Sequence, residues 1–236
     1  GAHIRHYLGN RVSKVFQEVE RLAQDKELKQ LPPGFIVSAT QRISASEDDQ
    51  LLNRMWAELL ISASDNYSSR YMVFADILAQ IGPDEARLLK RIGIDKGEVA
   101  DDHFDSFHDA YWKMMNVLDK YFYDEFTPIM ENKFTSEFEA LKYTMNVAEK
   151  LVKSDKFPGI VIHGVHIYQN PESSVQYTQK EDAVSINVLE RQNIVTVKTF
   201  SGGGPRINND RASMDFTMVR LTDLGASMLD ACKAQE

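Results

Sequence analysis

The stretch SEDDQLLNRMWAELLISAS, residues Ser46–Ser64, carries the clearest helical pattern in the chain. Its apolar residues recur at spacings of three and four, which puts them on one wide face of a helix. The residues on this face are Leu51, Leu52, Met55, Trp56, Leu59, Leu60 and Ala63. Ser46 is the predicted N-cap, and the acids Glu47, Asp48 and Asp49 follow it, where the helix dipole favours anions. The stretch therefore predicts an amphipathic helix that buries one face against other helices.

Helical patterns continue on both sides of this stretch. Arg5–Lys29 repeats apolar residues on one face and ends before Pro32 and Pro33, because tandem prolines cannot continue a helix. Further helices are predicted at Phe35–Ile43, Tyr71–Ile81 and Pro83–Ile92, the last with proline at its first helical position. Residues 1–96 are therefore expected to form a helical bundle.

The second half of the chain mixes helices with strands. Helices are predicted at His103–Phe126 and from Ser136 to Val152, and Ser136 with Glu139 has the pattern of a capping box. Ile160–Tyr168 is rich in β-branched residues, which favours a strand. The remaining predicted elements are a helix at Lys180–Gln192, strands at Ile194–Phe200 and Met214–Leu221, and a last helix capped by Thr222.

A helix, a β-hairpin and a closing helix follow one another in the layout of a winged-helix unit, in which residues 194–221 would be the wing. The predicted fold is therefore mainly α with a small β component. It consists of an N-terminal helical bundle in residues 1–96 and, in residues 97–236, a helical segment that leads into a winged-helix-like unit with a β-hairpin wing.

A glycine-rich segment, SGGGPRINND, lies between the two predicted wing strands. A P-loop would need a Lys-Ser/Thr pair and a following helix, and a dinucleotide-binding motif would need a third glycine where Ile207 stands. Neither pattern is present. We expect residues Ser201–Ser213 to form a long, mobile hairpin tip, on which Arg206 and Arg211 are candidate contacts to nucleic acid.

The charge of the chain disfavours a broad nucleic-acid surface. Its net charge is −8, and the balances of residues 1–100, 101–180 and 181–236 are −1, −5 and −2. A phosphate polyanion would be repelled unless positive charge were clustered locally. The candidate recognition helix, KEDAVSINVLERQN, holds three acids and two bases. DNA binding through the wing is therefore an alternative to the main interpretation.

Metal, thiol and membrane chemistry have little support in the sequence. Cys232 is the single cysteine, so internal disulfides and multi-cysteine metal sites are excluded, in keeping with a reducing cytoplasm. His163 and His166 are three residues apart in a predicted strand and should point to opposite faces of the sheet. No apolar run approaches the roughly 18–20 residues that span a bilayer. We expect no cofactor and no membrane segment.

Carboxylates cluster at Glu47–Asp49 and in the segment from Asp101 to Asp109. A metal-dependent nuclease would need converging acids, but both clusters lie at predicted helix starts, where acids are favoured for capping. The aromatic run His103–Phe122 has helical spacing, so we expect it in the core or at a helix–helix interface, including that of a homodimer. The expected protein is not an enzyme, and a nuclease is the least favoured alternative.

Several segments resemble the Abi-alpha (abortive infection alpha) family of bacterial proteins. They are PPGFIVSATQRISASEDDQLLNRMWAELLISASD (Pro32–Asp65), FADILAQIGPDEARLLKRI (Phe74–Ile92), INVLERQNIV (Ile186–Val195), VRLTDLGASMLDAC (Val219–Cys232) and, more loosely, GNRVSKVFQEV (Gly9–Val19). The resemblance implies a cytoplasmic protein of phage defence, in which an infected cell dies or stalls before phage is released. It brings no catalytic residues. The leading hypothesis is a non-enzymatic protein that acts through contacts with itself or with a phage or host protein.

Overall fold

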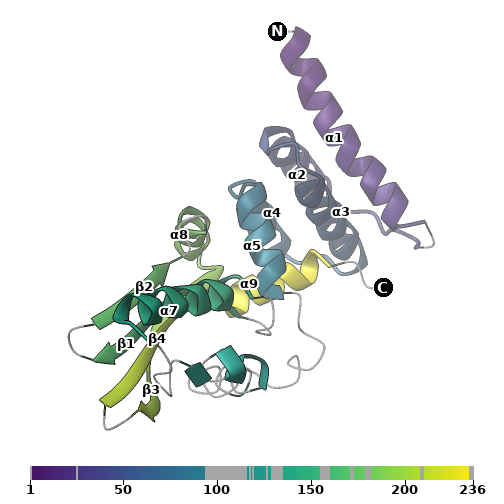
Figure 1. The fold of residues 1–236 in the computed structure, drawn as a ribbon. Helices are drawn as coiled ribbons and strands as arrows, with labels where there is room; N and C mark the ends of the chain where they lie inside the picture. The colour runs from purple at the N-terminus through teal and green to yellow at the C-terminus, as the bar shows by residue number, and fades with distance from the viewer. Residues whose placement is uncertain are drawn as a thin grey trace. The chain divides into compact units, whose positions relative to one another are not determined.

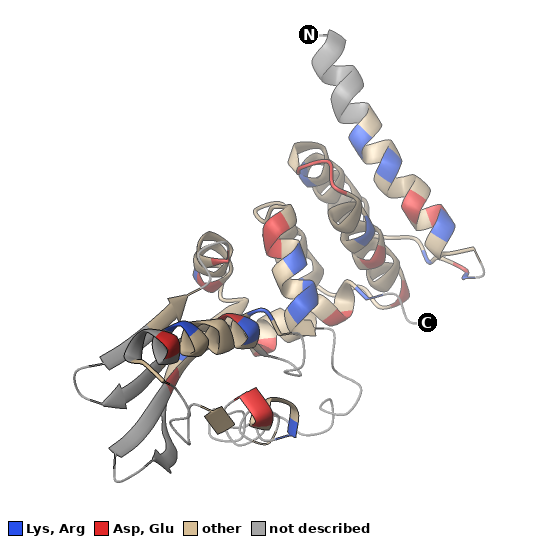
Figure 2. Ribbon diagram, in the orientation of Figure 1, with Lys and Arg blue, Asp and Glu red and all other residues tan. Residues whose placement is uncertain are grey.

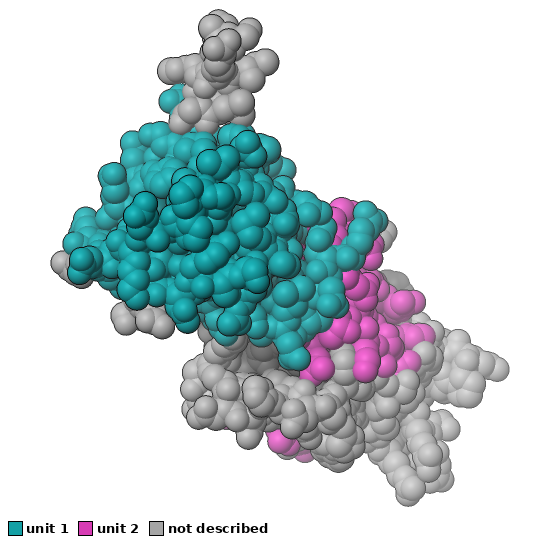
Figure 3. All heavy atoms as spheres, turned by 180° about the vertical axis from the view of Figure 1, so that it is seen from behind, with its two compact units in different colours: residues 1–89, 191–194, 222–236 teal, residues 90–190, 195–221 magenta. Residues whose placement is uncertain are grey.

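In the computed structural model the chain divides into two compact units (Figure 3). The first comprises Gly1–Leu89, Arg191–Ile194 and Thr222–Glu236, and the second comprises Lys90–Glu190 and Val195–Leu221. The structure describes residues 2–24, 26–93, 116, 118, 120–125, 127–128, 135–154, 160–170, 173–178, 182–207 and 210–233. The predicted boundary between residues 96 and 97 lies outside these residues and stays a prediction.

The first unit is built from helices (Figure 1). They are α1 (Ala2–Leu22), α2 (Pro33–Ala45), α3 (Gln50–Asp65), α4 (Arg70–Leu78), the part of α5 (Pro83–Gly93) up to Leu89, and α9 (Asp223–Ala231). α1, α4 and α9 all pack against α3. Leu52, Trp56 and Leu59 of α3 are fully buried. The predicted apolar face of this helix is thus confirmed as the centre of the unit's core.

The ends of two helices differ from the prediction. α1 ends at Leu22, before the expected Lys29. α3 is capped by Asp49 instead of Ser46, because an Asp49 carboxylate oxygen accepts hydrogen bonds from the N–H groups of Leu51 (2.8 Å) and Leu52 (3.2 Å). Ser46 is the C-cap of α2, where its N–H donates to carbonyls of the last turn. Serine and aspartate are both favoured at the N-cap, so the sequence alone does not tell whether Ser46 or Asp49 caps α3.

The second unit contains a four-stranded antiparallel sheet in the order β2-β1-β4-β3. Its elements are α7 (Glu137–Val152), β1 (Ile160–Asn170), β2 (Ser173–Thr178), α8 (Ala183–Arg191), β3 (Val195–Ile207) and β4 (Asp210–Leu221). α7 packs on β1 and β2. Val165, Phe216 and Met218 are buried in the sheet. The strand β2, in the polar segment SSVQYT, was not predicted from the sequence.

The glycine-rich segment belongs mostly to strands, which corrects the expectation of a thirteen-residue hairpin tip. β3 continues to Ile207 and β4 begins at Asp210, so the strands are joined by residues 208–209, which lie outside the described chain. The register pairs Gly203 with Ser213 and then shifts to pair Arg206 with Arg211. β3 is an edge strand, which tolerates a proline without loss of a ladder hydrogen bond inside the sheet.

The fold class is confirmed as mainly helical with a small antiparallel sheet. The chain order α8, β3, β4, α9 is the one expected for a winged helix. The described element that precedes α8 is the strand β2, at the place where a helix-turn-helix unit has its first helix. The winged-helix assignment therefore stays a prediction. In the part of the chain that the structure describes, no helix is long and apolar enough to cross a membrane.

Candidate functional site

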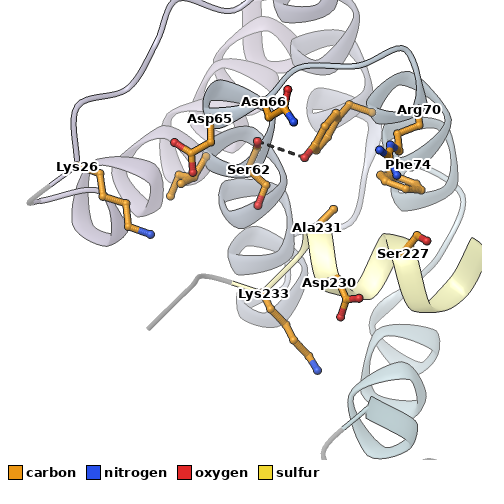
Figure 4. Close-up of a pocket in the computed structure, with 12 residues that line it drawn as sticks. Lys26, Ser62, Asp65, Asn66, Arg70, Phe74, Ser227, Asp230, Ala231 and Lys233 are labelled. Atoms are coloured by element: carbon orange, nitrogen blue, oxygen red, sulfur yellow. Dashed lines mark hydrogen bonds between the residues drawn. The ribbon is translucent and has the colours of Figure 1, made fainter. Parts of the chain in front are cut away.

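A cavity of about 360 Å³ in the first unit is the candidate site (Figure 4). The C-terminal turn of α3, the first turns of α4 and the end of α9 surround it. Its lining residues are Lys26, Ile61, Ser62, Asp65, Asn66, Arg70, Tyr71, Phe74, Ser227, Asp230, Ala231 and Lys233. We call it the α3–α4–α9 pocket. Its lining comes from segments far apart in the sequence, which explains why no local sequence motif predicted it.

The end of α3 and the start of α4 are tied together at the pocket wall. The hydroxyl of Tyr71 donates to the carbonyl of Ser62 at 3.2 Å, as Figure 4 shows, and the N–H of Asn66 donates to the same carbonyl at 3.3 Å. The Ser62 carbonyl, near the C-terminal end of α3, thus accepts two hydrogen bonds. Burial of the phenol raises the pKa of Tyr71 above its ordinary value of 10.0. Tyr71 is therefore a neutral hydrogen-bond donor that fixes the wall.

Aromatic rings connect the pocket wall to the α2 side of the unit. The ring centroids of Phe35 and Tyr67 are 5.3 Å apart, those of Tyr67 and Tyr71 are 6.3 Å apart, and those of Tyr71 and Phe74 are 5.9 Å apart. Such offset and edge contacts are favourable geometries for aromatic pairs. Phe35 and Phe74 are buried, whereas Tyr67 is exposed at the surface. The pocket thus has a firm apolar wall that continues to an exposed ring.

Charges of both signs surround this apolar wall. Lys26, Arg70 and Lys233 supply cations, and Asp65 and Asp230 supply carboxylates. Hydroxyls of Ser62 and Ser227 lie in the same lining, which holds no histidine and no cysteine. These groups can form ion pairs and hydrogen bonds with a charged, partly apolar segment.

The thiol of Cys232 follows the pocket residue Ala231 but points to the protein interior, as predicted for the inner face of the last helix. Only 3% of the residue is exposed. Burial raises the pKa of this thiol far above its ordinary value of 9.0, so it stays protonated and unreactive near neutral pH. Among the described residues, no three or more histidine, cysteine or acidic side chains come together in a way that could hold a metal ion.

Two of the three acids at Glu47–Asp49 have structural partners. Asp49 caps α3, and Asp48 forms ion pairs with Arg11 and Lys14 of α1. The hydrogen bond from Lys14 is the main cause of the lowered pKa of Asp48. The capping interpretation of this cluster is thus confirmed for Asp49. The second cluster, Asp101 to Asp109, lies outside the described residues.

A buried arginine was missed by the sequence reasoning. Arg11 is only 2% exposed and donates to the carbonyl of Ser46 at 3.4 Å, to its hydroxyl at 3.2 Å and to Asp48 at 3.4 Å. It therefore connects α1 to the turn between α2 and α3, whereas Lys14, Glu20 and Arg21 of the same helix are exposed. Figure 2 marks the charged positions along the ribbon. The sequence around Arg11 gives no sign that this side chain is buried, because its hydrogen-bond partners Ser46 and Asp48 come from another segment.

The candidate nucleic-acid contacts Arg206 and Arg211 occupy opposite register positions near the end of the β3–β4 hairpin. Their side chains lie outside the described part of the structure. In α8, the helix that would read bases, Val184 is 70% exposed and Asn187 and Glu190 are also exposed. Arg191, the last residue of α8, is exposed as well, so the exposed charges of this helix are one acid and one base, a poor face for the major groove.

The two strand histidines lie around an irregularity of β1. Ile162 pairs with Met218 and Gly164 pairs with Thr217, so His163 is the extra residue of a β-bulge. The bulge interrupts the alternation on which the prediction of opposite faces rests. The Nδ1 atom of His163 is buried and has no hydrogen-bond partner among the described residues. Burial lowers the pKa of this imidazole below its ordinary value of 6.5.

Comparison with known proteins gives one result. The model of a family described as abortive infection alpha matches residues 8–232. The match covers nearly the whole chain, including residues 97–179, for which no family motif was recognised in the sequence. No curated protein and no solved structure matches.

Proposed function

The chain belongs to the abortive infection alpha family, and from this premise we propose that it serves phage defence by binding a protein partner rather than by catalysis. The partner is a second copy of the chain or a protein of the phage or host, met in the cytoplasm. The family membership supports the role in abortive infection. The α3–α4–α9 pocket supports the mode of action, because its charged rim and aromatic wall suit a polypeptide segment.

The observation that carries the binding proposal is the mixture of charges at the pocket. Two charge reversals test it without harming the helices. Arg70 is the first residue of α4, and Asp230 lies in the last turn of α9. Because a helix dipole favours an acid at the N-terminus and a base at the C-terminus, Arg70→Glu and Asp230→Lys should both leave the fold intact.

The test is phage challenge of bacteria that carry the wild-type gene, each variant or no gene. We expect the wild type to cause early collapse of the infected culture with a reduced phage yield, and both reversals to restore the yield seen without the gene. Lys142→Glu, an exposed change on α7, is the matched control and should behave as wild type. Full protection by both reversals would contradict the pocket's role, and survival of infected cells would contradict abortive infection.

The alternative function, nucleic-acid binding, is favoured by one observation, the cross-strand register of Arg206 and Arg211. If the wing binds duplex DNA, affinity should fall steeply with salt, and Arg206→Glu with Arg211→Glu should remove it. Absence of binding at low salt, or binding that the double variant retains, would end this alternative.

A further inference from the structure

We propose that a second cavity of the first unit binds a small uncharged molecule with an apolar body and one hydroxyl or carbonyl group. This cavity measures about 400 Å³ and lies where α1, the chain before α2, α2 and α3 meet. We call it the α1–α3 pocket. Its volume falls in the range of small-molecule sites, about 300–1,000 Å³. This proposal is independent of the proposed function, which rests on the other pocket.

The walls of the α1–α3 pocket are mainly apolar. Phe16 and Val19 come from α1, Ile36 comes from α2 and Leu60 comes from α3. Phe16 and Val19 are three residues apart, so they lie on one face of α1. An apolar molecule that enters this space removes apolar surface from water on both sides of the contact, which is the main source of affinity for such a site.

Three polar side chains lie in this lining, those of Lys29, Gln30 and Ser64, and of these only Ser64 is buried. Ser64 is four residues after Leu60 on α3 and is only 6% exposed. Its hydroxyl is shut off from solvent and has no hydrogen-bond partner among the described residues. A serine within a helix commonly donates to the carbonyl four residues earlier, but this one does not. A buried hydroxyl without a partner is unfavourable, and a ligand oxygen that bonds to it would remove that penalty.

The charges near Ser64 specify the headgroup of the ligand. Ser64 lies in the last turn of α3, where the helix dipole is negative and disfavours an anion. Lys29, which also lines the pocket, donates from its ammonium group to the carbonyl of Asp65 at 3.1 Å. This ammonium group and the negative end of the helix dipole offset each other, and an apolar lining disfavours the burial of an unpaired charge of either sign, so the ligand is neutral.

The experiment compares three molecules with one tail and different headgroups: 1-heptanol, heptanoate and heptylamine. Titration calorimetry of the full chain should give saturable binding of 1-heptanol, with heptanoate and heptylamine at least about tenfold weaker. Ser64→Ala should weaken heptanol binding by roughly three- to tenfold, the usual value of one hydrogen bond. Ser62→Ala, on the same helix but lining the other pocket, is the matched control and should bind as wild type.

Two further variants keep the test independent of the hydroxyl. Ile36→Phe and Val19→Phe each fill the pocket and should abolish binding of all three probes, with circular dichroism used to confirm the helical fold. The proposal is overturned if 1-heptanol does not saturate, if heptanoate binds equally well, or if Ser64→Ala leaves its affinity unchanged. It is also overturned if a folded filled variant still binds 1-heptanol as wild type does.

Discussion

Gly225 gives the sharpest test of how the first unit is built. It lies in the first turn of α9, and its N–H donates to the hydroxyl of the N-cap Thr222 at 3.0 Å. The carbonyl of Ile194 approaches this turn and accepts from the N–H of Thr222 at 3.0 Å. A Cβ atom at Gly225 would overlap the oxygen of Ile194 and lie 3.0 Å from its carbonyl carbon. Only glycine therefore fits beneath this carbonyl.

We predict that Gly225→Ala destabilises the first unit by roughly 1–3 kcal/mol. Displacing the Ile194 backbone adds about 1–3 kcal/mol of packing strain and loses the hydrogen bond from Thr222, worth about 1 kcal/mol. The better helix propensity of alanine offsets about 1 kcal/mol of this cost. Gly34→Ala in α2 is the control, because a Cβ atom there meets nothing within 4 Å. It should stabilise the protein by up to about 1 kcal/mol.

The assay is urea unfolding followed by tryptophan fluorescence. The chain has two tryptophans, so a Trp112→Phe background leaves Trp56, which is fully buried in α3, as the reporter of the first unit. The midpoint of Gly225→Ala should fall and that of Gly34→Ala should rise or stay constant. If Gly225→Ala unfolds at the wild-type midpoint, the close approach of Ile194 to α9 is not a constraint in the folded protein.

Three other predictions concern single groups. The folded protein keeps the Cys232 thiol protonated, whereas the unfolded chain releases that proton near its ordinary pKa of 9.0. The stability that this burial gives should therefore be fully present below pH 9 and fall above it. Urea midpoints measured over a pH series should show this fall in the wild type and not in Cys232→Ala. Burial lowers the pKa of His163 below 6.5, so the unfolded chain binds a proton before the folded protein does as the pH falls. Stability should therefore decline below about pH 6.5. A similar decline in His163→Gln would show that His163 is not its cause. Asp49→Ala removes the N-cap of α3 and should lower the free energy of unfolding by about 1 kcal/mol, measured in urea. The side chain of Asp84 is 77% exposed, so Asp84→Ala should change it by no more than about 0.5 kcal/mol. Equal losses in the two variants would argue against a special role for Asp49.

The sequence predicted the elements whose signals are local. The apolar face around Trp56 and the N-caps at Thr222 and Ser136 are all present, because each depends on residues within one or two turns. The carboxylate of Glu139 accepts from Thr135 instead of the N–H of Ser136, so the predicted capping box is only half formed. Thr222 and Gly225 also belong to one of the segments that resemble the family. The structure gives this segment a physical basis, since one residue caps the helix and the other admits the backbone of Ile194.

The features that the sequence did not predict depend on distant partners. The segment SSVQYT forms β2 because β1 offers it an edge, although its own composition is polar and only weakly favours a strand. The strands β3 and β4 likewise hold Gly202 and Gly203 in register with Met214 and Ser213. The same reason applies to both pockets, whose linings bring together residues from segments far apart in the chain.

The division of the chain into interleaved segments has a consequence for its synthesis. The first unit begins with α1 but is completed by α9, which packs against α3 and is translated after the second unit. All of the second unit is translated in between. A ribosome that stops before Thr222 therefore leaves α3 without one of its packing partners, however correctly the earlier helices have formed. The first unit acquires its full set of core contacts only after α9 has been translated.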